Sequence, residues 1–263
     1  MPKAKTTKKV TPKTETLVNF ILDKSGSMGS IRESTISGFN EYLKTLQNDG
    51  NRYNFSLVLF ETAMLDLYTN EPIKNIKPLT IGTYVPDGMT ALYDSVCQTI
   101  ENVKRSVKKN QKVLTVIMTD GEENSSNEFT QKDMREKIQE LEKSGNWTFV
   151  FLGANQDSYA TAQAVGINVM NTANFVQSDA GMKSAMRTMA TGTSNFAMSA
   201  MSSTSSFFSR DDQQNLQNSG TPNLNGNLQN ITSSNTVDPA ISAHFSALGK
   251  KGYEAKRKKI LGE

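Results

Sequence analysis

The chain contains 263 residues, of which 36% are hydrophobic, and it carries a net charge of +3. No apolar run approaches the roughly 20 residues that a membrane-spanning helix needs, and no apolar stretch follows the basic N-terminus as a secretory signal would require. Cys97 is the single cysteine, which excludes a disulfide within the chain and fits a reducing compartment. We therefore expect a cytoplasmic protein without a membrane span.

The first predicted strand, helix and turn follow a short basic segment. We expect residues 1–15, which hold five lysines and one glutamate, to form a basic flexible tail. Leu17 to Leu22 is an apolar run of strand length that ends at Asp23. Ser30 and Glu33 form a capping-box pattern that predicts the start of a helix. Apolar residues then recur with the spacing of one helical face at Phe39, Tyr42, Leu43 and Leu46.

The next region predicts a hairpin, a long loop and a second helix. Tyr53 to Phe60 and Met64 to Thr69 are two strand-like runs, close enough to form a hairpin with an antiparallel strand at one edge of a sheet. Residues 71–90 contain three prolines and predict an irregular loop. One face of a helix follows at Leu92, Val96, Ile100, Val103 and Val107.

The alternation of strands and helices continues to about residue 170. Val113 to Met118 is fully apolar, as expected of a parallel strand buried on both faces. Thr130 and Asp133 form a second capping-box pattern. Three further elements are predicted: a strand over Trp147–Leu152, a short helix near Asp157–Val165 and a last strand near Ile167–Met170.

This alternation predicts an α/β fold: a Rossmann-like, doubly wound, mostly parallel sheet with one antiparallel edge strand and helices on both faces, spanning residues 16–172. A helical extension is expected over 173–201, where a methionine-rich face indicates either an adaptable partner surface or, more simply, a stripe packed onto the domain. The polar composition of 202–236 predicts a flexible linker, and 237–263 a basic segment able to form a helix.

Oxygen-bearing side chains follow two of the predicted strands. Asp23, Ser25 and Ser27 alternate directly after the first strand, Asp120 follows the strand that ends near Thr119, and Thr90 precedes a helix. The carboxyl ends of parallel strands meet at one edge of a sheet, where such folds bind ligands. Carboxylate and hydroxyl oxygens suit Mg²⁺, Mn²⁺ or Ca²⁺ rather than soft metals.

The pattern Asp23-x-Ser25-x-Ser27, the threonine at position 90 and the Thr-Asp-Gly ending at Gly121 resemble the metal-ion-dependent adhesion site (MIDAS) of von Willebrand factor A domains. The resemblance covers about residues 15–172 and extends to the stand-alone bacterial and phage versions of the domain. It implies that Ser25 and Ser27 ligate the metal, that Asp23 and Asp120 act directly or through water, and that Thr90 joins when a ligand is bound. Mg²⁺ is the expected ion.

Nearby charged residues have simpler interpretations. We expect Lys24, at a variable position of the motif, to be exposed. Glu122 and Glu123 could shape access to the metal, although a solvated loop is the simpler interpretation. Asp87 and Asp94 flank the loop of Thr90, where capping of a helix end explains them equally well.

The resemblance implies a binding module that engages an Asp or Glu of a protein partner, and not an enzyme. Hydrolase, dinucleotide-binding and P-loop motifs are absent, and the domain has no histidine to act as a base, although a metal-dependent hydrolase stays an alternative. The partner could be an AAA+ ATPase. Alternatively, the protein is a structural or virion-associated phage protein that docks through its C-terminal extension, located in the host cytoplasm or the virion. Nucleic-acid binding by the basic tails is a weaker hypothesis.

Overall fold

The computed structural model describes residues 14–154 and 158–219. Six strands of this part of the chain form one sheet, in the order β3-β2-β1-β4-β5-β6. The strands are β1 (Glu15–Asp23), β2 (Tyr53–Phe60), β3 (Met64–Pro72), β4 (Gln111–Thr119), β5 (Trp147–Gly153) and β6 (Thr172–Asn174). All neighbours pair in parallel except β3, which lies antiparallel to β2 at one edge. The predicted α/β fold with one antiparallel edge strand is therefore confirmed.

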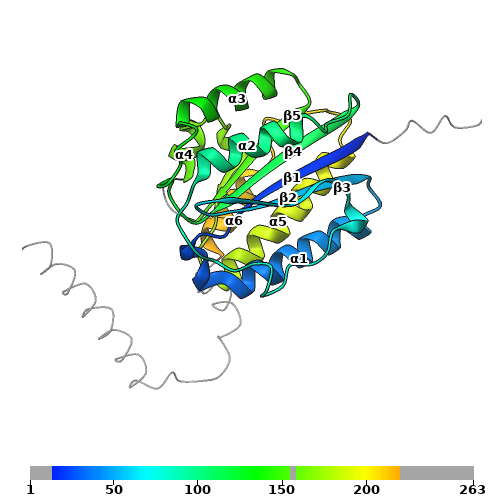
Figure 1. Ribbon diagram of the computed structural model, residues 1–263. Coiled ribbons are helices and arrows are strands. Elements are labelled where there is room, and N and C mark those ends of the chain that lie inside the picture. The colour runs from blue at the N-terminus through cyan, green and yellow to red at the C-terminus, as the bar shows by residue number, and fades with distance from the viewer. Residues whose placement is uncertain (1–13, 155–157, 220–263) are drawn as a thin grey trace, which may run out of the picture. The chain divides into compact units, whose positions relative to one another are not determined.

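Helices cover both faces of the sheet, as Figure 1 shows, with α1 and α5 on one face and α2 and α3 on the other. The helices are α1 (Arg32–Asn48), α2 (Leu92–Lys104), α3 (Gln131–Lys143), α4 (Ser158–Ala164), α5 (Asp179–Met198) and α6 (Arg210–Asn218), and the 3-10 turns are η1 (Gly26–Ile31), η2 (Ile73–Asn75) and η3 (Val169–Asn171). Because the central strands lie between two helical layers, β2, β4 and β5 are buried along their whole length.

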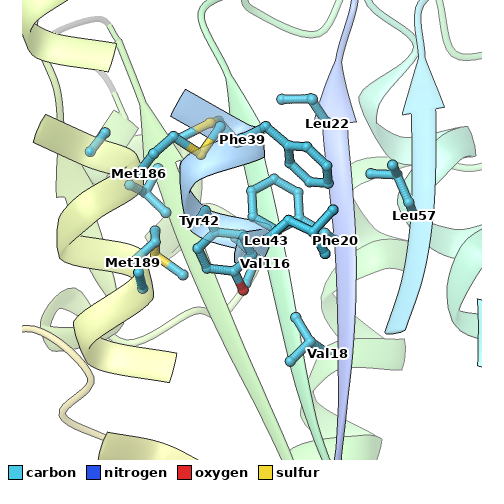
Figure 2. Close-up of a cluster of buried hydrophobic side chains, with 14 of the residues drawn as sticks. Val18, Phe20, Leu22, Phe39, Tyr42, Leu43, Leu57, Val116, Met186 and Met189 are labelled. Atoms are coloured by element: carbon cyan, nitrogen blue, oxygen red, sulfur yellow. The ribbon is translucent and has the colours of Figure 1, made fainter. Parts of the chain in front are cut away.

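An aromatic cluster fixes β1 against the helices on one face. The ring of Phe20 in β1 lies 5.6 Å from the ring of Phe39 and 5.3 Å from that of Tyr42, both in α1, in edge-on geometries that aromatic pairs favour. Figure 2 shows Met186 and Met189 of α5 facing the same cluster. This packing holds β1 and α1 firmly on either side of the turn that connects them.

The methionine face of α5 is part of the core. Met182, Met186 and Met189 are buried, which confirms the interpretation of a stripe packed onto the domain. The approach to α1 is close, because a Cβ added at Gly38 would lie 3.0 Å from Cγ of Met186. The segment predicted as a helical extension over 173–201 thus supplies a layer of the main fold.

Two local predictions were wrong. The last strand is β6 at 172–174 and not near 167–170, because the side chain of Asn168 accepts a hydrogen bond from the Met170 amide (2.9 Å) and starts the 3-10 turn η3 there. The first capping box does not form: η1 runs directly into α1, and the Ser30 hydroxyl donates to the Ser27 carbonyl (3.3 Å). The second box, of Thr130 and Asp133, is present at the start of α3.

The structure also differs from the predicted flexible linker over 202–236. Residues 210–218 form α6, whose start is capped reciprocally by Ser209 and Asp212. Phe208 and Leu216 are buried in the same core as α5, and these two apolar side chains give the polar segment an anchor that composition alone did not reveal.

The predictions for 1–13, for 220–236 and for the basic segment 237–263 lie outside the described residues. Within 14–154 and 158–219, no helix combines the length and the apolar character needed to cross a bilayer.

Candidate metal centre

The turn after β1 clips the carboxylate of Asp23 in place. The Ser25 amide donates to Oδ1 of Asp23 (2.6 Å), closing a short turn of the kind that aspartate favours. The hydroxyl of Tyr84 donates to the main-chain carbonyl of Asp23 (2.6 Å). Asp23 is fully buried and Ser25 is nearly so, whereas Ser27 at the end of the turn is exposed.

Hydrogen bonds join this turn to the end of β4. The hydroxyl of Thr119 donates to Oδ2 of Asp23 (2.5 Å), and the hydroxyl of Ser27 donates to Oδ1 of Asp120 (2.6 Å). The hydroxyl oxygens of Ser25 and Ser27 lie 3.1 Å apart. The two neighbouring strands β1 and β4 therefore bring four of the five predicted site residues together at the carboxyl edge of the sheet.

The loop before α2 adds Thr90 to the same place. The Thr90 amide donates to the side-chain oxygen of Asn124 (2.8 Å), and the Asn124 amide donates back to the Thr90 carbonyl (3.0 Å). A Cβ added at Gly121 would lie 2.9 Å from Oγ1 of Thr90 and 3.7 Å from Oγ of Ser27. Gly121 thus leaves a small space bordered by these hydroxyls.

Burial dominates the electrostatics of the two carboxylates. Loss of hydration raises the pKa of Asp23 to about 6, against the lowering effect of hydrogen bonds from Thr119 and Ser25, and the nearby charge of Asp120 raises it further. Burial also raises the pKa of Asp120, which the hydrogen bond from Ser27 partly offsets. The donors to Asp23 are neutral hydroxyl and amide groups, so its negative charge is held without a balancing cation from these partners.

This set of oxygens fits a hard divalent cation. The described residues contain no group of three or more His, Cys, Asp or Glu side chains placed to hold a metal, so a cation here would depend on hydroxyl oxygens beside two carboxylates. Such a set suits Mg²⁺, Mn²⁺ or Ca²⁺. The space at Gly121, which a Cβ would fill, is the structural feature that leaves room beside the hydroxyls.

The charged residues around the site have structural partners. Lys24 is not exposed as predicted: its side chain is 14% exposed and forms an ion pair with Glu61 (2.8 Å). Glu123 accepts hydrogen bonds from the main-chain amides of Tyr93, at the start of α2, and of Ser125. The solvated-loop interpretation therefore suits Glu122, which lies exposed, whereas Glu123 is half-buried and holds main-chain amides.

Asp94 and Asp87 act locally. Asp94 accepts hydrogen bonds from the amides of Asn127 and Phe129 (both 2.7 Å) and so holds the loop before α3. Asp87 accepts a hydrogen bond from the next amide, that of Gly88 (2.8 Å), within its own turn.

Gln177 is a residue of this site that the sequence analysis missed. It lies between β6 and α5, and its side-chain amide donates to Oδ2 of Asp120 (2.6 Å). The same nitrogen lies 3.4 Å from the Ser27 carbonyl. Gln177 is 57 residues from Asp120 in the chain, and a lone glutamine before a helix carries no local signal of such a contact.

Comparison with known proteins places the fold. No protein-family model and no curated protein matches the chain. Proximal thread matrix protein 1 from the mussel byssus, solved with a zinc-occupied MIDAS motif, is 13% identical with a TM-score of 0.50 over 65% of this chain and 46% of that chain. The pilus adhesin SpaC from Lactobacillus rhamnosus GG, in its open conformation, is 13% identical with a TM-score of 0.53 over 69% and 30%.

A third structure, the von Willebrand factor type A protein from Catenulispora acidiphila, is 16% identical with a TM-score of 0.49 over 69% of this chain and 43% of that chain. The chain thus spans less than half the length of each of these three proteins. At these identities the similarity concerns the fold alone, which is that of von Willebrand factor A domains.

Proposed function

We propose that the carboxyl edge of the sheet holds a divalent cation, Mg²⁺ by preference, and that the protein uses it to bind an Asp or Glu side chain of a protein partner. The observation that carries the proposal is the convergence of two buried carboxylates and three hydroxyls from three separate loops. Helix caps and turn motifs explain any one of these residues, but they do not explain why all five gather at one point.

In this proposal Ser25 and Ser27 contact the cation directly, Asp23 and Asp120 act directly or through water, and Thr90 joins when the partner is bound. Two carboxylates and neutral hydroxyls leave a dication electrophilic, so a further carboxylate makes a charge-assisted contact. The zinc-occupied MIDAS of the mussel protein supports metal occupancy in a protein of this fold. Oxygen ligands alone favour Mg²⁺, Mn²⁺ or Ca²⁺ here.

The binding proposal is preferred to a metal-dependent hydrolase. Catalysis would need a general base beside the metal, and the chain's single histidine, His244, falls outside the described residues. The buried carboxylates are already engaged by Thr119, Ser25 and Ser27. No observation favours an AAA+ ATPase, a virion component or nucleic acid as the partner, and these remain predictions from the sequence.

Thermal unfolding of the full chain in EDTA, Mg²⁺, Mn²⁺ and Ca²⁺ tests the metal site. A metal that binds only the folded state should stabilise the wild type by about 2.7 kcal/mol at a hundred times its dissociation constant. Asp23→Ala should remove this response, and Asp211→Ala, an exposed aspartate in α6, should keep it. A wild type that unfolds at the same temperature in EDTA and in millimolar amounts of each metal would refute the proposal.

A further inference from the structure

Three exposed apolar side chains lie on the segment that leads to the candidate metal centre. Ile81 is 69% exposed, Val85 48% and Met89 52%, and all three belong to the segment between η2 and α2. We call these three side chains the apolar rim. Single exposed apolar residues are ordinary, but several on one segment that is bonded to the turn of Asp23 favour a contact surface there.

The rim is attached directly to the turn of Asp23. The hydroxyl of Tyr84, the neighbour of Val85, donates to the Asp23 carbonyl (2.6 Å). The Asp87 amide donates to the carbonyl of Lys24 (2.9 Å), and the amide of Gly26 donates to the carbonyl of residue 88 (3.2 Å), directly before Met89. Met89 is in turn followed by Thr90, so the rim lies at the border of the five oxygen ligands.

The rim loop is held in shape by α1. The guanidinium of Arg32, at the start of α1, donates to the carbonyls of Tyr84 (2.9 Å) and Ile81. Asn40, further along α1, exchanges two hydrogen bonds with the main chain of Leu79, of 2.9 and 2.7 Å. A loop that is ordered before binding loses little conformational freedom when a partner packs on it, so apolar contacts there are effective.

The charges on this face determine what kind of partner fits. The side chains of Asp87 and Glu122 are exposed, and Asp23 and Asp120 are buried. The lysine in the turn already pairs with Glu61. A partner's carboxylate therefore finds its attraction in the cation, while further acidic residues beside it would be repelled.

We infer that the apolar rim binds the residues next to the partner's acidic side chain. The partner is then a protein segment in which an Asp or Glu has an aliphatic or aromatic neighbour: the carboxylate contacts the cation, and the neighbour packs on Ile81, Val85 and Met89. This inference rests on the proposed function and adds the sequence character of the partner.

Selection from a library of displayed peptides tests it. The peptides carry a central Asp or Glu, or a matched Asn or Gln, between randomised positions, and they are selected on the full chain in Mg²⁺ with EDTA as the background. We expect enrichment of the acidic peptides, with aliphatic or aromatic residues next to the acid. The enriched peptides should lose about tenfold in affinity for Met89→Ser or Val85→Ser, the order expected when some 50 Å² of apolar contact is lost.

The chain offers matched controls at the other end of the sheet, where the parallel strands begin. Met198 is 64% exposed at the end of α5, and Val169 is 59% exposed in the turn before β6. Met198→Ser and Val169→Ser should leave peptide affinity unchanged. All four variants alter exposed side chains and should keep the wild-type thermal shift in Mg²⁺, which shows that the fold and the metal site are intact.

The outcomes separate this inference from the proposed function. Two outcomes would support the metal-dependent contact but overturn the role of the rim. In one, the enriched acidic peptides carry random neighbours. In the other, the Met89 and Val85 variants bind these peptides as tightly as the wild type does. Equal enrichment of acidic and amide peptides, insensitive to EDTA, would overturn both. If the metal still stabilises the protein but no acidic peptide is enriched, the inferred partner class is wrong while the metal site stands.

Discussion

The parallel strands bury a charged side chain at each of their two ends, and the two charges have opposite signs. At the edge where β4 begins, Lys112 is 1% exposed, and its ammonium group donates to the carbonyls of Phe196 (2.5 Å), Ser199 (2.8 Å) and Met201 (3.3 Å) at the end of α5. Where β4 ends, the Ser25 amide and the Thr119 hydroxyl donate to Asp23, and burial raises its pKa.

The partners just named are neutral groups at both ends, and the difference lies in what else surrounds each charge. The carbonyls at a helix C-terminus carry partial negative charge that favours the ammonium group of Lys112, although burial still lowers the pKa of this amine. The hydrogen bonds to Asp23 do not overcome its loss of hydration. Without a metal, the fold therefore disfavours the negative charge of this carboxylate. What sets Asp23 apart is the second carboxylate beside it, because the charge of Asp120 raises the pKa of Asp23 further.

The largest effect on the free energy of unfolding is expected for the substitution of Lys112. Lys112→Met should lower the free energy of unfolding by about 3 kcal/mol, because three carbonyls at the end of α5 lose their donor. Urea unfolding in EDTA measures it, with the exposed Lys132→Met as the control. Metal affinity should not change. A loss below about 0.5 kcal/mol would mean that water replaces the ammonium group as the donor to these carbonyls.

Asp23→Asn, at the other end of the strands, should change the free energy of unfolding in the opposite direction. Without metal at pH 7.5, it should raise the free energy of unfolding by about 1–2 kcal/mol, since a raised pKa measures how strongly the fold disfavours the charge. It should also remove the stabilisation by Mg²⁺. The measurement is urea unfolding with and without metal. A destabilised Asn variant in EDTA would contradict our account of the Asp23 environment.

The pH dependence of the protein in EDTA follows from the same shift. The pKa of Asp23 is about 6 in the fold and 3.8 for an unperturbed aspartate, so the folded state binds more protons between these values. Its contribution to stability is therefore present below about pH 4 and is lost as the pH rises through 6. Asp23→Asn should lack this contribution. Because protons compete with the cation, metal affinity in calorimetry should weaken as the pH falls below 6.

Gly121→Ala is expected to have a smaller effect that is specific to metal binding. Its Cβ would lie 2.9 Å from Oγ1 of Thr90, so the variant should bind Mg²⁺ about tenfold more weakly while unfolding within roughly 1 kcal/mol of the wild type. Gly29→Ala is the matched control, because a Cβ there meets no atom within 4 Å. Equal metal affinity of the two variants would place the cation away from Thr90.

The smallest effect is expected for Gln177→Ala. The variant removes one hydrogen bond that orients Oδ2 of Asp120, and Mg²⁺ affinity should change by about threefold. Gln98→Ala removes a similar amide–carboxylate bond of 2.6 Å, to Glu128, and should leave metal affinity unaltered. If calorimetry finds the two variants identical, Gln177 does not position Asp120.

The sequence predicted the turn of Asp23 better than the segments after residue 166. The turn of Asp23 follows a strand that is apolar on both faces, and both features are local, so periodicity and motif spacing were sufficient to find them. The strand β6 was displaced by a single asparagine-capped turn, and α6 is held by contacts of Phe208 and Leu216 with distant parts of the core. Such contacts leave no periodic signal in a short polar segment.

The sequence by itself determined the alternating α/β pattern, the antiparallel edge strand and the five candidate ligands, because strand periodicity and strand-end motifs depend on neighbouring residues. Only the tertiary structure decided that Gln177 reaches Asp120, that Lys24 pairs with Glu61, and that an apolar rim borders the site. These features join residues far apart in the chain, and their geometry exists only once the sheet has brought its strand ends and loops to one edge.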